Sequence, residues 1–212
     1  MPHLLIVRHG ETWHNVQRVL SSQRPGPGLN ATGHEQADRL AALLRDTPIE
    51  AVYSSPLRRA LETARILSQG RGAPRIAAEL SEVEVGDLEG QTSQGAFDAY
   101  HTTLEAWMKG LALDSPLGGS GETARQVLDR GEGFLRRMTA SHHSGTILIV
   151  THSTFMRLTL AHLVVNLESA WVSARPVPNT GTVSLTYAPD GAPICLDWCG
   201  DQPSDCGLRD AV

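Results

Sequence analysis

The sequence lacks long apolar runs, and no stretch approaches the roughly 18–20 apolar residues of a membrane span. Its N-terminus has no basic segment followed by an apolar run, so no signal peptide is predicted. These two absences predict a protein without a membrane partner, and we expect a cytoplasmic location.

Runs of like charge are also absent, and the 212 residues carry a formal net charge of −5. A nucleic-acid-binding protein is expected to present a basic face, so no nucleic-acid partner is predicted. A small anionic substrate is still compatible with this charge, because a few arginines can create a local positive site inside an acidic protein.

Cysteines are few, and all three lie near the C-terminus, at Cys195, Cys199 and Cys206. An odd number in a chain of this length is not a disulfide framework. One disulfide, or a contribution of Cys195 and Cys199 to a metal site, stays open. The favoured interpretation is that the thiols are reduced and have no specific role.

No linker rich in proline, glycine and serine divides the chain. We expect a single domain over residues 1–200 and a loose C-terminal tail at 201–212. Strand and helix patterns alternate along the domain, which favours an α/β sandwich with a mostly parallel sheet. The expected strands are 3–8, 49–55, 74–80 and 146–150 with a terminal hairpin over 179–199, and the expected helices are 31–45, 56–69, 122–140 and 153–165, with helical fragments in 91–118.

Two of these strands, "LLIV" at 4–7 and "ILIV" at 147–150, have no polar alternation. Such strands are typical of the centre of a parallel sheet that is covered on both faces. Polar residues follow both, with Arg8 and His9 after the first and His152 after the second. Ligands of open α/β sheets bind beyond the carboxyl ends of the strands. If the two strands are neighbours, His9 and His152 face one crevice.

The residues at these strand ends and in the loops after them suit a phosphoryl group. Arginine pairs with phosphate oxygens through two parallel hydrogen bonds. Gly10 allows the backbone to approach a ligand closely, and the helix that begins at Ser153 has an N-terminus that attracts anions. The candidates are Arg8, His9, Gly10, Asn15, Arg58, Glu82, His152 and Ser153.

Phosphoryl transfer also needs a nucleophile and an acid. A histidine can be the nucleophile when its reacting nitrogen is unprotonated, and nearby arginines favour its neutral form. Glu82 is the candidate acid, because a carboxyl group near a desolvated pocket can hold a proton for the leaving alcohol.

Five blocks of the sequence, in the same order, resemble the histidine phosphatases, the family that includes the cofactor-dependent phosphoglycerate mutases. "LIVRHGETWHN" is similar to the Arg-His-Gly-Glu/Gln-Thr/Ser-x-x-Asn signature of that family. "GLNATGHEQADRLAALL" looks like the stretch that leads into its first long helix. The other matching blocks are "VYSSPLRRALETA", "LSEVEVGDLEG" and "ILIVTHS".

This resemblance implies roles for six of the candidates. His9 would be the phosphorylated nucleophile, and Arg8, Arg58 and His152 would hold the phosphoryl oxygens, while Arg59 is assigned to the solvated face of its helix. Asn15 would add a hydrogen bond. Glu82, which the motif spacing selects over Glu84 and Glu89, would be the proton donor and then the base. The implied fold is a three-layer α/β/α sandwich around a mixed six-stranded sheet with one antiparallel strand.

The family contains both phosphatases and mutases, and the short segment 83–151 between Glu82 and His152 resembles the phosphatase branch. The mutase-like Ser-Gly-Trp segment is replaced by "LSSQRPGPG". We therefore predict a phosphatase acting on small-molecule phosphate esters, with no cofactor and no metal ion. A homodimer is left open, since dimers are common in the family.

Three alternatives are kept. They are a phosphoglycerate mutase, a non-catalytic phospholigand-binding module, and a metallohydrolase with His9, His152 and Glu82 as ligands. The arginines argue against a metal site, because cations repel a metal ion. Phe97, Tyr100 and Trp107 lie in a variable segment that is expected either to cover the site as a lid or to pack in the core. His14 and the other histidines outside the motifs are expected to be surface or packing residues.

Overall fold

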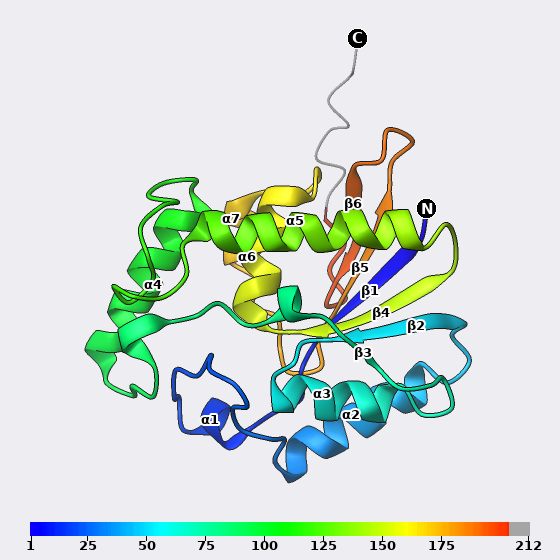
Figure 1. Ribbon diagram of the computed structural model, residues 1–212, viewed down its shortest axis with the longest axis horizontal. Coiled ribbons are helices and arrows are strands. Elements are labelled where there is room, and N and C mark those ends of the chain that lie inside the picture. The colour runs from blue at the N-terminus through cyan, green and yellow to red at the C-terminus, as the bar shows by residue number, and fades with distance from the viewer. Residues whose placement is uncertain (204–212) are drawn as a thin grey trace.

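The computed structural model describes residues 1–203 and contains one mixed six-stranded sheet in the order β3-β2-β4-β1-β5-β6 (Figure 1). Only β5 runs antiparallel to the others, because it pairs antiparallel with both β1 and β6. The strands are β1 (His3–Arg8), β2 (Ile49–Ser54), β3 (Arg75–Ile76), β4 (Thr146–Thr151), β5 (Thr182–Tyr187) and β6 (Pro193–Trp198). The helices are α1 (Trp13–Val16), α2 (Ala31–Leu43), α3 (Arg58–Leu67), α4 (Gln94–Met108), α5 (Ala124–Ser141), α6 (Ser153–Leu163) and α7 (Ser169–Ser173).

The two apolar strands are parallel neighbours at the centre of the sheet, with Arg8 aligned with Thr151 at their carboxyl ends. Side chains alternate across a strand, so Leu4 and Ile6 pack on one face of the sheet and Leu5 and Val7 on the other. Both faces are therefore buried, which explains the lack of polar alternation and confirms the predicted central position.

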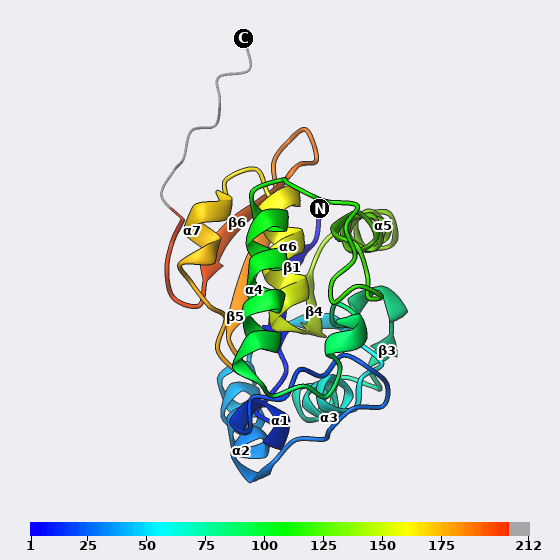
Figure 2. The ribbon, with the colours of Figure 1, turned by 90° about the vertical axis from the view of Figure 1, so that its left-hand side faces the viewer.

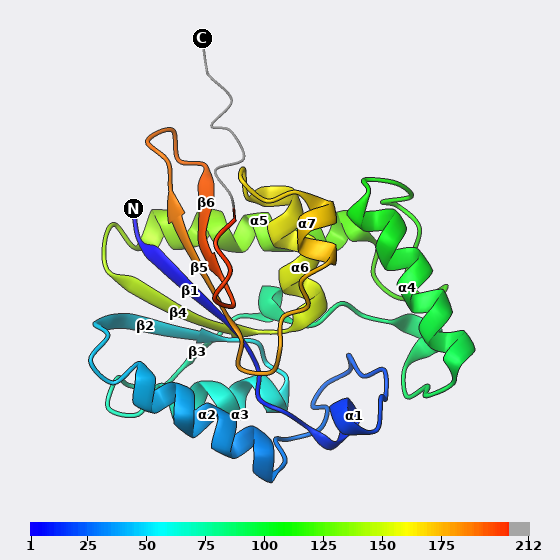
Figure 3. The same ribbon diagram turned by 180° about the vertical axis from the view of Figure 1, so that it is seen from behind.

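Helices cover both faces of the sheet. Helices α2 and α3 lie below it in Figure 1, and the view from behind in Figure 3 shows the same layer. Helices α5 and α6 cover the opposite face, and α4 packs beside α6 and α7 at one end (Figure 2). The predicted three-layer α/β/α sandwich is confirmed.

Local signals fix where several helices begin. The Asn30 side chain accepts a hydrogen bond from the Gly33 amide at 2.8 Å and caps α2. A capping box between Thr123 and Gln126 begins α5. These two helices therefore begin where their sequences place a polar cap before an apolar face.

Three elements differ from expectation. The strand predicted at 74–80 pairs only over Arg75–Ile76 and continues as a 3₁₀ turn, η1 (Ala78–Leu80). The fragments expected in 91–118 include one continuous helix, α4, capped by Ser93. The helix after Pro56 begins at Arg58 rather than at the proline.

Cys206 and most of the predicted tail, residues 204–212, lie outside the described residues. Cys195 and Cys199 are free thiols. Within residues 1–203, no helix is both long enough and apolar enough to cross a membrane.

Candidate active site

His9 and His152 meet at the carboxyl ends of β1 and β4. The parallel pairing of these strands brings the two rings within 5.2 Å of each other, measured between ring centroids. Both side chains are buried. The two histidines therefore lie side by side at the strand ends, as expected, with His9 lining a cavity and His152 buried beside it.

The ring of His9 is held in one tautomer. Its Nδ1 lies 2.7 Å from the carbonyl oxygen of Gly10, which can only accept, so Nδ1 carries the proton. Nε2 is then the unprotonated nitrogen, and it accepts a hydrogen bond from Nε of Arg59 at 3.1 Å. Burial, followed by the charges of Arg59 and Arg8, lowers the pKa of His9 well below its usual value. The nitrogen that is free to attack is therefore available at neutral pH.

Gly10 is needed at its position for space. A Cβ there would lie 2.6 Å from the carbonyl oxygen of Gly33, a contact that real Cβ atoms do not make. The Gly10 amide donates to Oγ1 of Thr63 at 3.0 Å, which ties the turn after β1 to α3. Gly10 thus allows β1, α2 and α3 to converge behind the nucleophile.

Arg59, and not Arg58, lies at the site, so the expected positions of these two residues were wrong. Arg59 is 4% exposed, contacts His9 and also donates to the Ser21 carbonyl. The Arg58 side chain is 63% exposed and pairs with Glu62 at 2.7 Å one turn along α3. The physical reason is helical periodicity: Arg59 lies one turn before the buried Thr63.

The two buried arginines present hydrogen-bond donors that the protein does not satisfy. Nη1 of Arg59 and Nε of Arg8 are buried and have no partner among the described residues. Burial lowers the pKa of Arg59 to about 10, although the Glu82 carboxylate opposes this shift. Arg59 is therefore still a cation at neutral pH. Unpaired buried donors on two cations indicate an anion-binding site.

His152 lies beside His9 at the end of β4 and is fully buried. Its Nε2 lies 2.7 Å from Oγ of Ser55, while its buried Nδ1 has no partner in the described part of the chain. Burial, then the Arg59 charge and His9, lowers the pKa of His152 well below its usual value. One buried ring nitrogen of His152 is thus without a partner among the described residues.

The Glu82 carboxylate lies at the N-terminus of α6. It accepts hydrogen bonds from the amides of Phe155 at 3.0 Å, Thr154 at 3.4 Å and Val83 at 2.9 Å. The cavity at this site is lined by Arg8, His9, Arg59 and Glu82, among others. Ser153 does not line it, and the helix N-terminus binds Glu82, which corrects the expectation for Ser153.

The neighbouring acids, Glu84 and Glu89, do not line the cavity as Glu82 does. The Glu89 carboxylate accepts hydrogen bonds from the amide and the Oγ of Ser22. Glu84 is exposed. Glu82 alone of the three lines the cavity, in agreement with the motif spacing.

Asn15 also lines the cavity, but its Oδ1 is already engaged. It accepts from the Thr12 amide at 3.1 Å in the capping box of α1, and from Nδ2 of Asn179 at 3.4 Å. Asn179 also donates to the carbonyl of His9 at 3.0 Å. Asn15 can therefore offer only its amide N–H groups to a ligand.

The cavity has a volume of about 120 Å³ and includes one residue that sequence reasoning missed and one that it named as a possible lid. His14, expected to be a surface or packing residue, lines it, and so does Tyr100. Tyr100 contacts Oγ1 of Thr154 at 2.5 Å, and burial raises its pKa to about 12. Trp107 is fully buried in the core instead, and Phe97 packs under Arg18. Of the three aromatic residues in the expected lid segment, only Tyr100 reaches the cavity.

The alternative of a metal site was tested on side-chain geometry. Within residues 1–203, no three His, Cys, Asp or Glu side chains are placed to hold a metal ion. His9, His152 and Glu82, the ligands that this alternative requires, do not form such a group.

Comparison with known proteins shows the family. Residues 4–198 match the model of the histidine phosphatase superfamily (branch 1), and the chain belongs to this superfamily. It is 33% identical over 170 residues to the adenosylcobalamin/alpha-ribazole phosphatase of Escherichia coli, covering 79% of this chain and 82% of that one. It is 29% identical to phosphoserine phosphatase 1 of Hydrogenobacter thermophilus, covering 81% of each.

The fold has a counterpart among solved structures. A mycobacterial glucosyl-3-phosphoglycerate phosphatase superposes with a TM-score of 0.79 at 24% identity, covering 94% of this chain and 99% of that one. This likeness confirms the fold. The family and the phosphatase relatives confirm the predicted enzyme class, a hydrolase of phosphate esters.

Proposed function

We propose that the protein hydrolyses small-molecule phosphomonoesters through a phosphohistidine formed on Nε2 of His9. One observation carries this proposal: Gly10 fixes the tautomer of His9, so that its unprotonated Nε2 sits beside two buried, under-satisfied arginines. The arrangement supports a neutral nucleophile next to an anion-binding site, which is what attack on a phosphate ester requires.

In the first step, Nε2 of His9 forms a bond to phosphorus while the bond from phosphorus to the ester oxygen breaks. The electron pair of that bond goes to the leaving oxygen, which takes a proton from Glu82. In the second step, Glu82 accepts a proton from water as the water oxygen bonds to phosphorus. The bond between nitrogen and phosphorus then breaks, and inorganic phosphate leaves.

The surrounding groups take the roles that their free atoms allow. The unpaired donors of Arg8 and Arg59 are offered to the phosphoryl oxygens, where negative charge builds up in the transition state. Nδ1 of His152 and the amide of Asn15 add further contacts. Ser153 and Arg58, in contrast, are given no role.

Phosphoglycerate mutase activity is the alternative within the same mechanism, with a substrate hydroxyl instead of water as the acceptor. The cytoplasmic location, the absence of a nucleic-acid partner, the lack of a cofactor or metal requirement and the homodimer stay predictions. Light scattering after size exclusion measures the oligomeric state directly.

The test is phosphate release from a panel of esters in a chelating buffer. The panel contains alpha-ribazole phosphate, phosphoserine and 3-phosphoglycerate, with mutase products monitored for the last. The variants are His9→Asn and His143→Asn, the second being an exposed histidine away from the cavity.

We expect hydrolysis, together with an acid-labile phosphoryl label on the protein, in the wild type and in His143→Asn only. Retention of both in His9→Asn would refute the assignment of the nucleophile. Phosphate transfer to a second hydroxyl without release would favour the mutase.

A further inference from the structure

We propose that Arg130 and Glu122 are positioning residues for proton transfer, because together they fix the main chain that carries Glu82. This inference rests on the proposed function, in which Glu82 is the acid. Neither residue lines the cavity.

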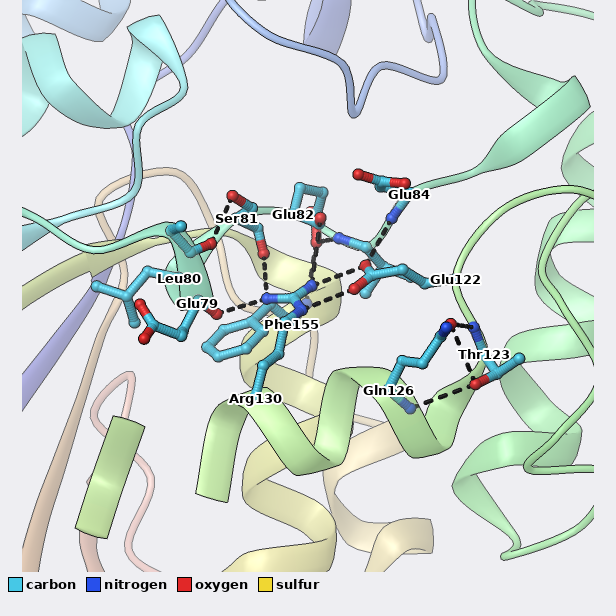
Figure 4. Close-up of polar contacts among 12 residues, drawn as sticks. Glu79, Leu80, Ser81, Glu82, Glu84, Glu122, Thr123, Gln126, Arg130 and Phe155 are labelled. Atoms are coloured by element: carbon cyan, nitrogen blue, oxygen red, sulfur yellow. Dashed lines mark hydrogen bonds and ion pairs between the residues drawn. The ribbon is translucent and has the colours of Figure 1, made fainter. Parts of the chain in front are cut away.

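Arg130, on α5, binds the loop immediately before and at Glu82. Its Nη1 donates to the carbonyl oxygens of Glu79 at 2.5 Å and Ser81 at 2.8 Å (Figure 4). Its Nη2 lies 3.4 Å from the carbonyl oxygen of Glu82 itself. One guanidinium thus binds three carbonyl groups in four consecutive residues. The carbonyl of Leu80, between them, accepts from Oγ1 of Thr151 at 2.7 Å. The segment after η1 has no helix or strand before Gly86.

Glu122 binds the loop on the other side of Glu82. Its Oε2 accepts from the Glu84 amide at 3.0 Å, and its own amide donates to the Glu84 carbonyl at 3.0 Å. The same carboxylate forms a two-point ion pair with Arg130, at 2.8 Å and 2.9 Å. The ion pair therefore joins the anchors on the two sides of the acid.

The carboxylate end of Glu82 is held separately, by the first amides of α6. Phe155 connects the two supports: its amide donates to Oε1 of Glu82, and the Arg130 guanidinium covers its ring at 4.8 Å. The main chain of the acid is thus fixed from α5 and its side chain from α6. Loss of the Arg130 anchor would let the two ends move relative to each other.

The burial of this ion pair supports a positioning role. The side chains of Arg130 and Glu122 are 15% and 17% exposed, and in every other ion pair of residues 1–203 at least one partner exceeds 20%. This ion pair is partly buried, and it contributes little net stability compared with apolar packing, because desolvation opposes the attraction. Its directional bonds to the loop are what apolar side chains could not replace.

The expected effect depends on the leaving group. An acid that has moved out of line slows loss of a poor leaving group, such as an alkoxide, but matters little for 4-nitrophenolate, which leaves without a proton. The value of kcat/KM includes the steps up to this first transfer and excludes hydrolysis of the phosphohistidine. The ratio of kcat/KM for benzyl phosphate to that for 4-nitrophenyl phosphate is also independent of how much enzyme is folded.

The experiment measures this ratio in the wild type, Glu82→Gln, Arg130→Gln, Glu122→Gln and the double variant E82Q/R130Q. Arg137→Gln is the matched control, because Arg137 lies on the same helix and pairs with the Glu79 side chain without binding the loop backbone. We expect Arg130→Gln and Glu122→Gln to lower the ratio roughly tenfold or more, in the same direction as Glu82→Gln. The double variant should match Glu82→Gln within about twofold, because Arg130 acts through Glu82.

The outcomes separate this inference from the proposed function. A wild type without hydrolysis, or a ratio unchanged in Glu82→Gln, counts against the proposed function. A reduced ratio in Glu82→Gln with an unchanged ratio in Arg130→Gln and Glu122→Gln overturns the positioning role alone. The same holds if these variants slow both esters equally, or if Arg137→Gln lowers the ratio as much as Arg130→Gln does.

Discussion

Arg59 donates a hydrogen bond from Nε to Nε2 of His9, although its neighbour Arg58 points to solvent and pairs with Glu62. The contact places a cation against the nitrogen that would be phosphorylated. Before substrate binds, it keeps that nitrogen unprotonated. When a phosphoryl group arrives, the guanidinium can turn its donors to the phosphoryl oxygens, which accumulate negative charge.

The adjacent arginines form a matched pair for mutation. We expect Arg59→Ala to reduce kcat/KM by roughly 10²–10³, the usual cost of removing one donor to a transition-state oxyanion. Arg58→Ala removes a largely exposed side chain with one surface ion pair and should stay within about threefold of the wild type. The measurement is kcat/KM on any ester that the wild type hydrolyses. Equal losses in both variants would contradict the assignment.

The error over Arg58 and Arg59 has a physical origin. Both fall inside the "SSPLRRALETA" block, and a charged residue is ordinarily expected on the solvated face of a helix. The buried face of α3 carries Ala60, Thr63 and Leu67. Arg59 precedes Thr63 by four residues, so helical periodicity places Arg59, and not Arg58, on the buried face. A charged side chain that belongs to a functional site can lie on the buried face of a helix, contrary to the usual expectation of a solvated position.

Other features could not be read from the sequence because they depend on distant contacts. The strands at 4–7 and 147–150 were predictable from their apolar runs, which need no partner to be recognised. The roles of Asn179 and Tyr100 are different, since each depends on packing against a remote segment. The N-terminus of α6 was expected to bind substrate, but Glu82 reaches it from a remote loop.

The pKa of His9 can be tested in the free protein by NMR of the ring nitrogens. Because burial and the charges of Arg59 and Arg8 lower the pKa of His9, we expect a neutral ring with the proton on Nδ1 well below pH ~6.5. Arg59→Met removes the second of these causes and should move the pKa upward, while burial keeps it below the usual value. An unchanged titration in Arg59→Met would contradict the electrostatic coupling.

Stability should depend on pH through the same groups. Burial lowers the pKa of His9 and of His152 in the folded state. A histidine in the unfolded chain keeps a pKa of about 6.5, so below this pH the unfolded state binds more protons than the folded state. The free energy of unfolding should therefore fall as pH drops from ~7 to ~5, by up to about 1.4 kcal/mol per pH unit for each histidine.

Urea unfolding at several pH values checks this expectation. His9→Asn should show a shallower decline than the wild type, because one of the two groups has been removed. The exposed His143→Asn should follow the wild type. A slope unaffected by His9→Asn would show that other groups dominate.

Two glycines on α5 test how closely that helix must approach α6. A Cβ on Gly131 would lie 2.7 Å from Cγ2 of Thr159, whose hydroxyl is bonded to the Phe155 carbonyl and cannot turn away freely. Gly133 has no atom within 4 Å of the same position. Gly133→Ala should therefore stabilise the protein by about 1 kcal/mol through helix propensity, whereas Gly131→Ala should lose that gain to the clash.

The same pair of variants reports on the acid, because α5 carries Arg130 and α6 carries the amides that bind Glu82. Gly131→Ala, which forces the two helices apart, should lower kcat/KM for benzyl phosphate more than for 4-nitrophenyl phosphate. Gly133→Ala should leave both unchanged. Urea unfolding and the two values of kcat/KM are measured for both variants. A stabilised Gly131→Ala variant with unaltered kinetics would mean that the contact between the helices adjusts without disturbing Glu82.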